Sequence, residues 1–169
     1  MPTMLSFPAT MLAATLLNLT APEVTERVDW APYDTVITMI RGGCERRCPV
    51  FRVAIFADGI VIIEGRYYLQ HPVLKTFEIQ SNQVKRLADR FAAIDYFNLP
   101  NDFGYKGKGC TSLGNDDGPS VITTFVSGGR GKSIIHHLGC LGAIPDQLTA
   151  LEHEIDLAVN AKKWVKPLR

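Results

Sequence analysis

The chain has 169 residues, of which 46% are hydrophobic and 21% charged, and its formal net charge is +1. This balance is typical of one globular domain and excludes an intrinsically disordered chain. So small a net charge also excludes the strong overall field that draws proteins to nucleic acid, so we expect no nucleic-acid partner. An electrostatic function would have to come from a local patch.

The N-terminal segment differs in composition from the rest. No charged side chain precedes Glu23, and residues 11–17 form a short apolar run that is followed by the small residues Thr20 and Ala21. This pattern is typical of a secretory signal peptide and is too short for a transmembrane helix.

We therefore predict a signal peptide at 1–21, a linker at 22–33 and a single domain at 34–169. The predicted location is secreted or periplasmic, and the mature protein should contain no transmembrane segment. Two features favour instead a disordered start or an N-terminal core helix: no Lys or Arg precedes the apolar run, and Pro8 interrupts it. A cytoplasmic protein with free thiols is a further alternative.

Four strands are expected in the first half of the domain, at residues 35–40, 50–57, 60–66 and 75–79. Asp58-Gly59 lies between the second and third and is a strong signal for a two-residue hairpin turn, because glycine tolerates positive φ. With that turn, Val53 and Ile62 should share one face of the hairpin, and Ala54 and Ile63 the other.

Two amphipathic helices are expected, one from about residue 81 to 94 and one from Pro145 onward. Between them, residues 101–120 form a long irregular loop, and residues 121–138 form a second hairpin. The predicted fold class is α+β, with an antiparallel sheet of about five to six strands built from two hairpins and with two helices packed on one face.

The segment before the first hairpin carries a motif. Residues 43–51 read Gly-Cys-Glu-Arg-Arg-Cys-Pro-Val-Phe, and residues 117–120 read Asp-Gly-Pro-Ser. Over residues 34–165 the sequence resembles a family of bacterial, mostly exported domains of unknown function, number 6438. The resemblance implies a fold and an exported location, but no activity. The positions that carry it include Cys44, Cys48, Pro49, Phe51, Asp58, Gly59, Gly65, Pro119, Asp156 and Trp164.

The chain has four cysteines, and in an exported protein this number predicts two disulfides with three conceivable pairings. We favour Cys44–Cys48, within one turn, and Cys110–Cys140, which would tie the long loop to the segment after the last strand. The rival interpretation is a four-cysteine zinc site. Such sites usually have two close Cys pairs, whereas Cys110 and Cys140 are far apart in the sequence. We therefore predict no metal site, and we expect no cofactor.

One cluster of positive charge stands out: Arg41, Arg46, Arg47 and Arg52 fall within twelve residues around the first two cysteines. Guanidinium groups bind carboxylate and phosphate in bidentate fashion. The cluster is therefore a candidate site for an anionic envelope component, such as a polymer carboxylate or phosphate. The alternative is a solvated basic turn in which Arg52 pairs with an acid on the sheet.

The sequence contains no catalytic or nucleotide-binding motif that we recognise. His136 and His137 are neighbours on a predicted strand and should point to opposite faces. We predict an exported binding or envelope-associated module. The alternative is a hydrolase-like enzyme that uses His136 with Asp116 or Asp117.

Overall fold

The protein is described by a computed structural model that covers residues 36–44, 47–104, 109–113 and 118–168. The predicted signal peptide and linker, together with Arg46, Asp116 and Asp117, lie outside the described residues.

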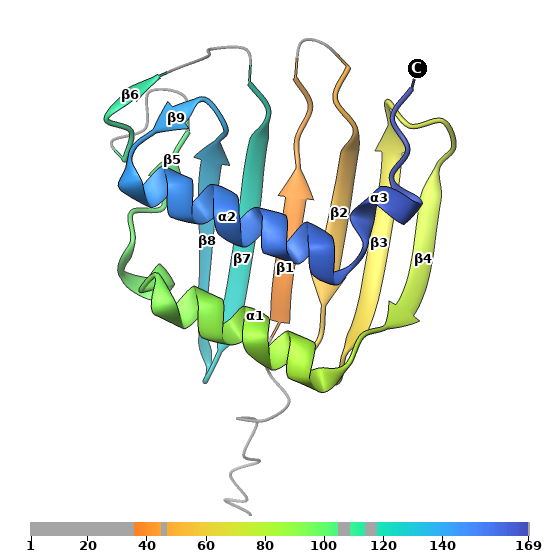
Figure 1. The fold of residues 1–169 in the computed structure, drawn as a ribbon, viewed down its shortest axis with the longest axis horizontal. Helices are drawn as coiled ribbons and strands as arrows, with labels where there is room; N and C mark the ends of the chain where they lie inside the picture. The colour runs from red at the N-terminus through yellow and green to blue at the C-terminus, as the bar shows by residue number, and fades with distance from the viewer. Residues whose placement is uncertain (1–35, 45–46, 105–108, 114–117, 169) are drawn as a thin grey trace, which may run out of the picture.

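A seven-stranded sheet forms one layer of the fold (Figure 1). All neighbouring strands in it are antiparallel except β5, which pairs in parallel with β8. In their order across the sheet, the strands are β4 (Val73–Glu78), β3 (Ile60–Tyr67), β2 (Val50–Ile55), β1 (Val36–Arg41), β7 (Ser120–Ser127), β8 (Arg130–His137) and β5 (Asp102–Phe103). A separate two-stranded sheet pairs β6 (Ser112–Leu113) with β9 (Cys140–Leu141).

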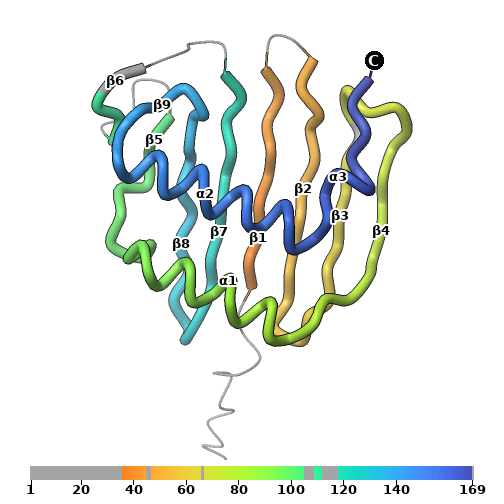
Figure 2. The backbone as a smooth tube through the Cα atoms, in the orientation of Figure 1, coloured from red at the N-terminus to blue at the C-terminus, as the bar shows by residue number. Residues whose placement is uncertain are grey.

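The helices form the second layer. The two long helices, α1 (Ser81–Ala93) and α2 (Ala143–Ala158), cross the same face of the sheet (Figure 2). A 3-10 helix, η1 (Tyr96–Asn98), follows α1, and the short α3 (Ala161–Trp164) follows α2. The predicted α+β fold is confirmed, and the sheet has one strand more than expected. The extra strand is β5, whose two residues are too few to show the alternation that reveals a strand.

The hydrophobic core lies between these two layers. Each of the central strands turns alternate apolar side chains toward the helices, which supply stripes at helical spacing. Side chains buried to 4% exposure or less in this core include Ile37, Met39, Val53, Ile55, Val61, Ile63, Phe125, Leu87, Phe91, Leu148, Leu151 and Ile155. Burying each side chain of this size contributes about 1.5–3 kcal/mol, which fixes both helices on the sheet.

The β2–β3 hairpin differs from the predicted one in its register. The Phe56 amide donates a hydrogen bond to the Ile60 carbonyl, so residues 57–59 make a three-residue loop between this pair, and Gly59 adopts φ +94. Val53 therefore faces Ile63 across the two strands, so the prediction that Val53 shares a face with Ile62 was wrong. Glycine in the left-handed region suits a three-residue hairpin loop as well as a two-residue one, and one added residue reverses every side chain of the following strand.

Both expected cysteine pairings are present in the structure. The Cys44–Cys48 disulfide closes the turn between β1 and β2, and the Cys110–Cys140 disulfide joins the segment after β5 to β9. None of the helices in the described part of the chain is long and apolar enough to cross a membrane.

Candidate functional site

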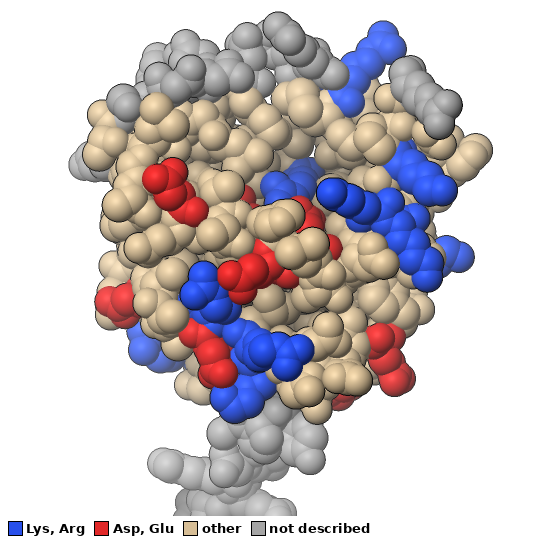
Figure 3. Space-filling view, viewed as in Figure 1, with Lys and Arg blue, Asp and Glu red and all other residues tan. Residues whose placement is uncertain are grey.

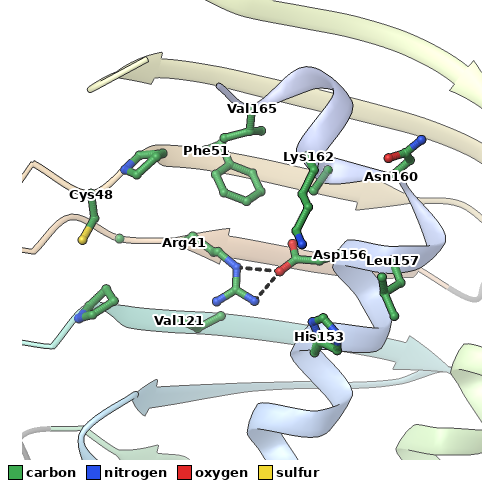
Figure 4. A pocket seen from close by; sticks show the side chains of 14 residues that line it. Arg41, Cys48, Phe51, Val121, His153, Asp156, Leu157, Asn160, Lys162 and Val165 are labelled. Carbon is green, nitrogen blue, oxygen red and sulfur yellow. Dashed lines mark hydrogen bonds and ion pairs between the residues drawn. The ribbon is translucent and has the colours of Figure 1, made fainter. Parts of the chain in front are cut away.

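A pocket of about 340 Å³ lies on the helix side of the sheet, between the Cys44–Cys48 disulfide and the C-terminal part of α2 (Figure 4). This volume is at the lower end of the range for small-ligand pockets. Its walls are mainly apolar and are formed by Pro49, Phe51, Val121, Leu157 and Val165, among others.

The sheet register places three of the lining side chains next to one another. Arg41, at the end of β1, lies opposite Phe51 of β2 on one side and opposite Val121 of β7 on the other. Directly opposed residues of antiparallel strands point to the same face. Arg41 continues the alternation of Ile37 and Met39, so this guanidinium points to the helix side at the point where the core ends.

The Arg41 guanidinium is held by a carboxylate of α2. Its Nε and Nη2 atoms donate hydrogen bonds to Oδ2 of Asp156, at 3.1 Å and 2.6 Å. The side chains of this pair are only 20% and 23% exposed, so the pair is partly shielded from water. None of the described residues accepts a hydrogen bond from the third nitrogen, Nη1.

A second cation approaches the same place. Figure 4 shows the Lys162 side chain of α3 directed toward Asp156. With Arg41 and Lys162 counted as +1 each and Asp156 as −1, these three lining groups carry a formal charge of +1. The charged part of the pocket therefore favours an anion, while the rest of the wall favours apolar groups.

A buried acid lies one helical turn before Asp156. Glu152 Oε1 is 2.8 Å from Nδ1 of His136, and both side chains are only 1% exposed. Burial raises the pKa of Glu152, while the His136 hydrogen bond, the His136 charge and the Arg41 charge act in the opposite direction. This pair joins α2 to β8 beneath the surface and so helps to fix the part of α2 that carries Asp156.

The three described arginines of the predicted cluster, Arg41, Arg47 and Arg52, do not converge. Arg41 lies in the pocket, whereas Arg52, next to Phe51 on β2, points to the opposite face and is exposed. Arg47 is also exposed, and Arg46 lies outside the described residues. Of the three arginines of the cluster that the structure describes, only Arg41 lines the pocket.

The two histidines lie on opposite faces, as strand geometry requires, and both are buried. His137 Nδ1 accepts a hydrogen bond from the Gly139 amide at 3.0 Å. The partners foreseen for a hydrolase, Asp116 and Asp117, are outside the described residues, and His136 pairs with Glu152 instead.

The described ranges contain no group of three His, Cys, Asp or Glu residues placed to hold a metal ion. All four cysteines are engaged in disulfides, so none can ligate zinc as a thiolate.

Sequence reasoning missed both of the charged residues that accompany Arg41 in the pocket, Asp156 and Lys162. Lys162 gave no signal, because it reaches the pocket only through the packing of α3. Asp156 is one of the positions of the family resemblance, but the sequence assigns it no role. A usable signal was the alternation that places Arg41, a charged residue, on the otherwise apolar face of β1.

Segments distant in sequence, all of them part of the family resemblance, meet at this pocket. Cys48, Pro49 and Phe51 come from the first motif, Pro119 from the second, and Asp156 from the last helix.

No curated protein is found to match the chain. Residues 35–159 match the family described as a domain of unknown function, DUF6438. The chain therefore belongs to the DUF6438 family.

Proposed function

We propose that this protein is an exported binding module, and that the pocket beside the Cys44–Cys48 disulfide holds a small ligand with an apolar body and an anionic group. One observation carries the proposal: a partly shielded guanidinium, fixed by a carboxylate, lies in an otherwise largely apolar pocket where the segments of the family resemblance meet. The sequence predicts an anionic envelope component as the ligand. Because most of the pocket wall is apolar, we propose that this ligand also has an apolar part.

The apolar wall and the charged wall of the pocket would bind different parts of the ligand. Phe51, Leu157 and Val165 would remove apolar ligand surface from water, at about 25 cal/mol per Å². Arg41 Nη1 and the Lys162 ammonium would bind a carboxylate, sulfonate or phosphate through charge-assisted hydrogen bonds. Because Asp156 already orients Arg41, ligand binding need not order that side chain.

Export is supported by the two disulfides, because such bonds persist in oxidising compartments outside the cytoplasm. The hydrolase alternative has less support. Its candidate His136 is 1% exposed and does not line the pocket, so it cannot reach a substrate bound there.

The proposal can be tested by NMR titration of the ¹⁵N-labelled protein with octanoate, which combines an alkyl chain and a carboxylate. Octanol and sulfate are the matched probes, each of which lacks one of the two parts. We expect octanoate to shift the amide signals of Phe51, Leu157 and Val165, and the Arg41 side-chain Nε–H signal, at lower concentrations than either control. Equal responses to the three probes, or shifts confined to other parts of the molecule, would overturn the proposal.

A further inference from the structure

Two acid–base pairs lie next to each other beneath α2. Arg41 of β1 is opposite Val121 of β7, and Val121 is opposite His136 of β8, so the three residues form one row across the sheet. Directly opposed residues of antiparallel strands share a face, and this row points to the helix side. Figure 1 shows α2 crossing β8, β7 and β1. Along this path Glu152 lies 2.8 Å from His136. One turn later, Asp156 accepts the hydrogen bonds of Arg41.

The two pairs are close enough to interact electrostatically. Their acids are four residues apart on α2, which is about 6 Å along the helix axis. Their bases are two strands apart, a separation of about 10 Å. Val121, the residue between the bases in the row, lines the pocket. Arg41 and Asp156 both act on the charge of Glu152, so the pocket pair and the inner pair are coupled.

The inner pair is shielded from water, whereas the pocket pair is not fully so. The side chains of His136 and Glu152 are 1% exposed, against 20% and 23% for Arg41 and Asp156. Within the described part of the chain, His136 Nε2 and Glu152 Oε2 are buried without a hydrogen-bond partner. A charge in such a place is poorly solvated, so a proton gained or lost there changes the potential at a neighbouring site more than a surface proton would.

Other titratable groups on the elements around Glu152 are placed differently. Tyr96 of η1 feels the charge of this acid, but burial raises the pKa of Tyr96 to about 12, so the phenol stays neutral. Arg90 of α1 pairs with an acid on the exposed side of α2. Lys162 of α3 and His153 of α2 line the pocket itself. Because histidine commonly titrates in the physiological range, His153 is the rival source of any pH effect there.

The surface charges over this region are mixed in sign. Figure 3 shows Asp and Glu side chains interspersed with Lys and Arg side chains on the helix face. Salt screens exposed charges over a distance of about 8–10 Å, but it screens buried charges much less. The inner pair is therefore better placed than these surface groups to alter the binding strength of Arg41.

We propose that anion binding in the pocket is coupled to the uptake of a proton by the Glu152–His136 pair. This inference rests on the function proposed above. When the pair loses a proton, one negative charge is added behind Arg41, whichever of the two residues releases it, and the pocket holds an anion less tightly. A bound anion in turn favours the protonated pair, because such coupling is reciprocal. The affinity for an anionic ligand therefore falls as the pH rises through the titration of the pair.

The test is calorimetric titration of the full chain with octanesulfonate at a series of pH values from about 5 to 9. This probe stays ionised throughout, so only the protein titrates. Glu152→Gln keeps the shape of the acid but cannot ionise, and His153→Gln removes the rival group. Circular dichroism checks that both variants are folded. A second measurement needs no variant: NMR follows the titration of the His136 ring nitrogens and the Glu152 carboxyl carbon with and without octanesulfonate.

We expect the affinity of wild type and of His153→Gln to fall roughly tenfold as the pH rises, and that of Glu152→Gln to change much less. Bound octanesulfonate should move the titration midpoint of the pair upward by about one pH unit, the same factor expressed as a proton affinity.

The failure of this inference differs from the failure of the proposed function. No binding of octanesulfonate at any pH would overturn both. Octanesulfonate binding with an unchanged midpoint of the pair would overturn the proton coupling alone. So would a pH dependence that persists in Glu152→Gln or disappears in His153→Gln.

Discussion

Arg41 on β1 and Asp156 on α2 are 115 residues apart in the sequence, yet two hydrogen bonds to a single carboxylate oxygen join them in the pocket. The pair therefore has two roles. It links the sheet to the C-terminal part of α2, and it orients the charged group that we assign to ligand recognition.

The first role predicts a measurable coupling energy. Arg41→Gln and Asp156→Asn should each lower the free energy of unfolding by about 1–2 kcal/mol, a range reduced because the pair is partly exposed. The double variant should be more stable than the sum of the two losses implies, with a coupling of about 1 kcal/mol in urea unfolding. Additive losses would show that the pair does not contribute to stability as a unit.

The buried acid Glu152 predicts a pH dependence with a definite sign. Burial raises its pKa in the folded state, so the folded protein holds this proton more tightly than the unfolded chain does. The contribution of Glu152 to stability is then complete below its unfolded pKa and is lost as the pH rises through the raised folded pKa.

We therefore expect the stability of wild type relative to Glu152→Gln to fall as the pH increases from about 4 toward 8. Urea unfolding at a series of pH values measures this difference. The control is Glu154→Gln, which lies on the same helix as Glu152 but forms an exposed ion pair with Arg90 of α1, and it should show a much flatter profile. A relative gain of wild-type stability with rising pH would contradict the account.

The two disulfides should differ in their effect on stability. Cys110 and Cys140 are 30 residues apart, whereas Cys44 and Cys48 are four apart. If each bond acts by restricting the unfolded chain, Cys110→Ser/Cys140→Ser should cost about 3–4 kcal/mol and Cys44→Ser/Cys48→Ser about 2 kcal/mol. Thermal or urea unfolding of both variants tests this order, and a larger loss for the shorter loop would reverse it.

Export makes a prediction about the covalent state of the chain. Intact mass analysis of the secreted or periplasmic fraction should find a chain that begins near residue 22 and has all four cysteines oxidised. Protein with Met1 retained and reduced thiols, found in the cytoplasm, would refute the proposed location.

Much of the fold could be predicted because it is encoded by local periodicity. The six longer strands are mostly short runs of β-branched and other apolar residues bounded by turn residues, and the two long helices carry apolar stripes at the helical period. The predicted register of β3 against β2 was wrong because Asp58-Gly59 suits both a two-residue and a three-residue hairpin loop. Only tertiary packing chooses between these two loop lengths. The strand β5 was missed because Asp102 and Phe103 form too short a segment to carry a pattern.

The site was less accessible to sequence reasoning because its parts meet only in three dimensions. Arg41 and Arg52 are close in sequence, but they point to opposite faces of the sheet. Their clustering in the sequence was therefore no guide to clustering in space. Asp156 and Lys162 reach the pocket through the packing of α2 and α3, which no spacing in the sequence reveals.

The most direct test of the central claim is the affinity of the protein for octanoate relative to octanol, measured by isothermal titration calorimetry. Wild type should bind octanoate at least about tenfold more tightly, because only the carboxylate can bind Arg41 and Lys162. The Arg41→Gln/Asp156→Asn variant should lose most of that preference. Leu157→Trp, which fills the pocket from an exposed position, should weaken both ligands, while Leu141→Trp on β9 should weaken neither. Equal affinity of wild type for octanoate and octanol, or unchanged octanoate binding by Leu157→Trp, would contradict the assignment of this pocket as the binding site.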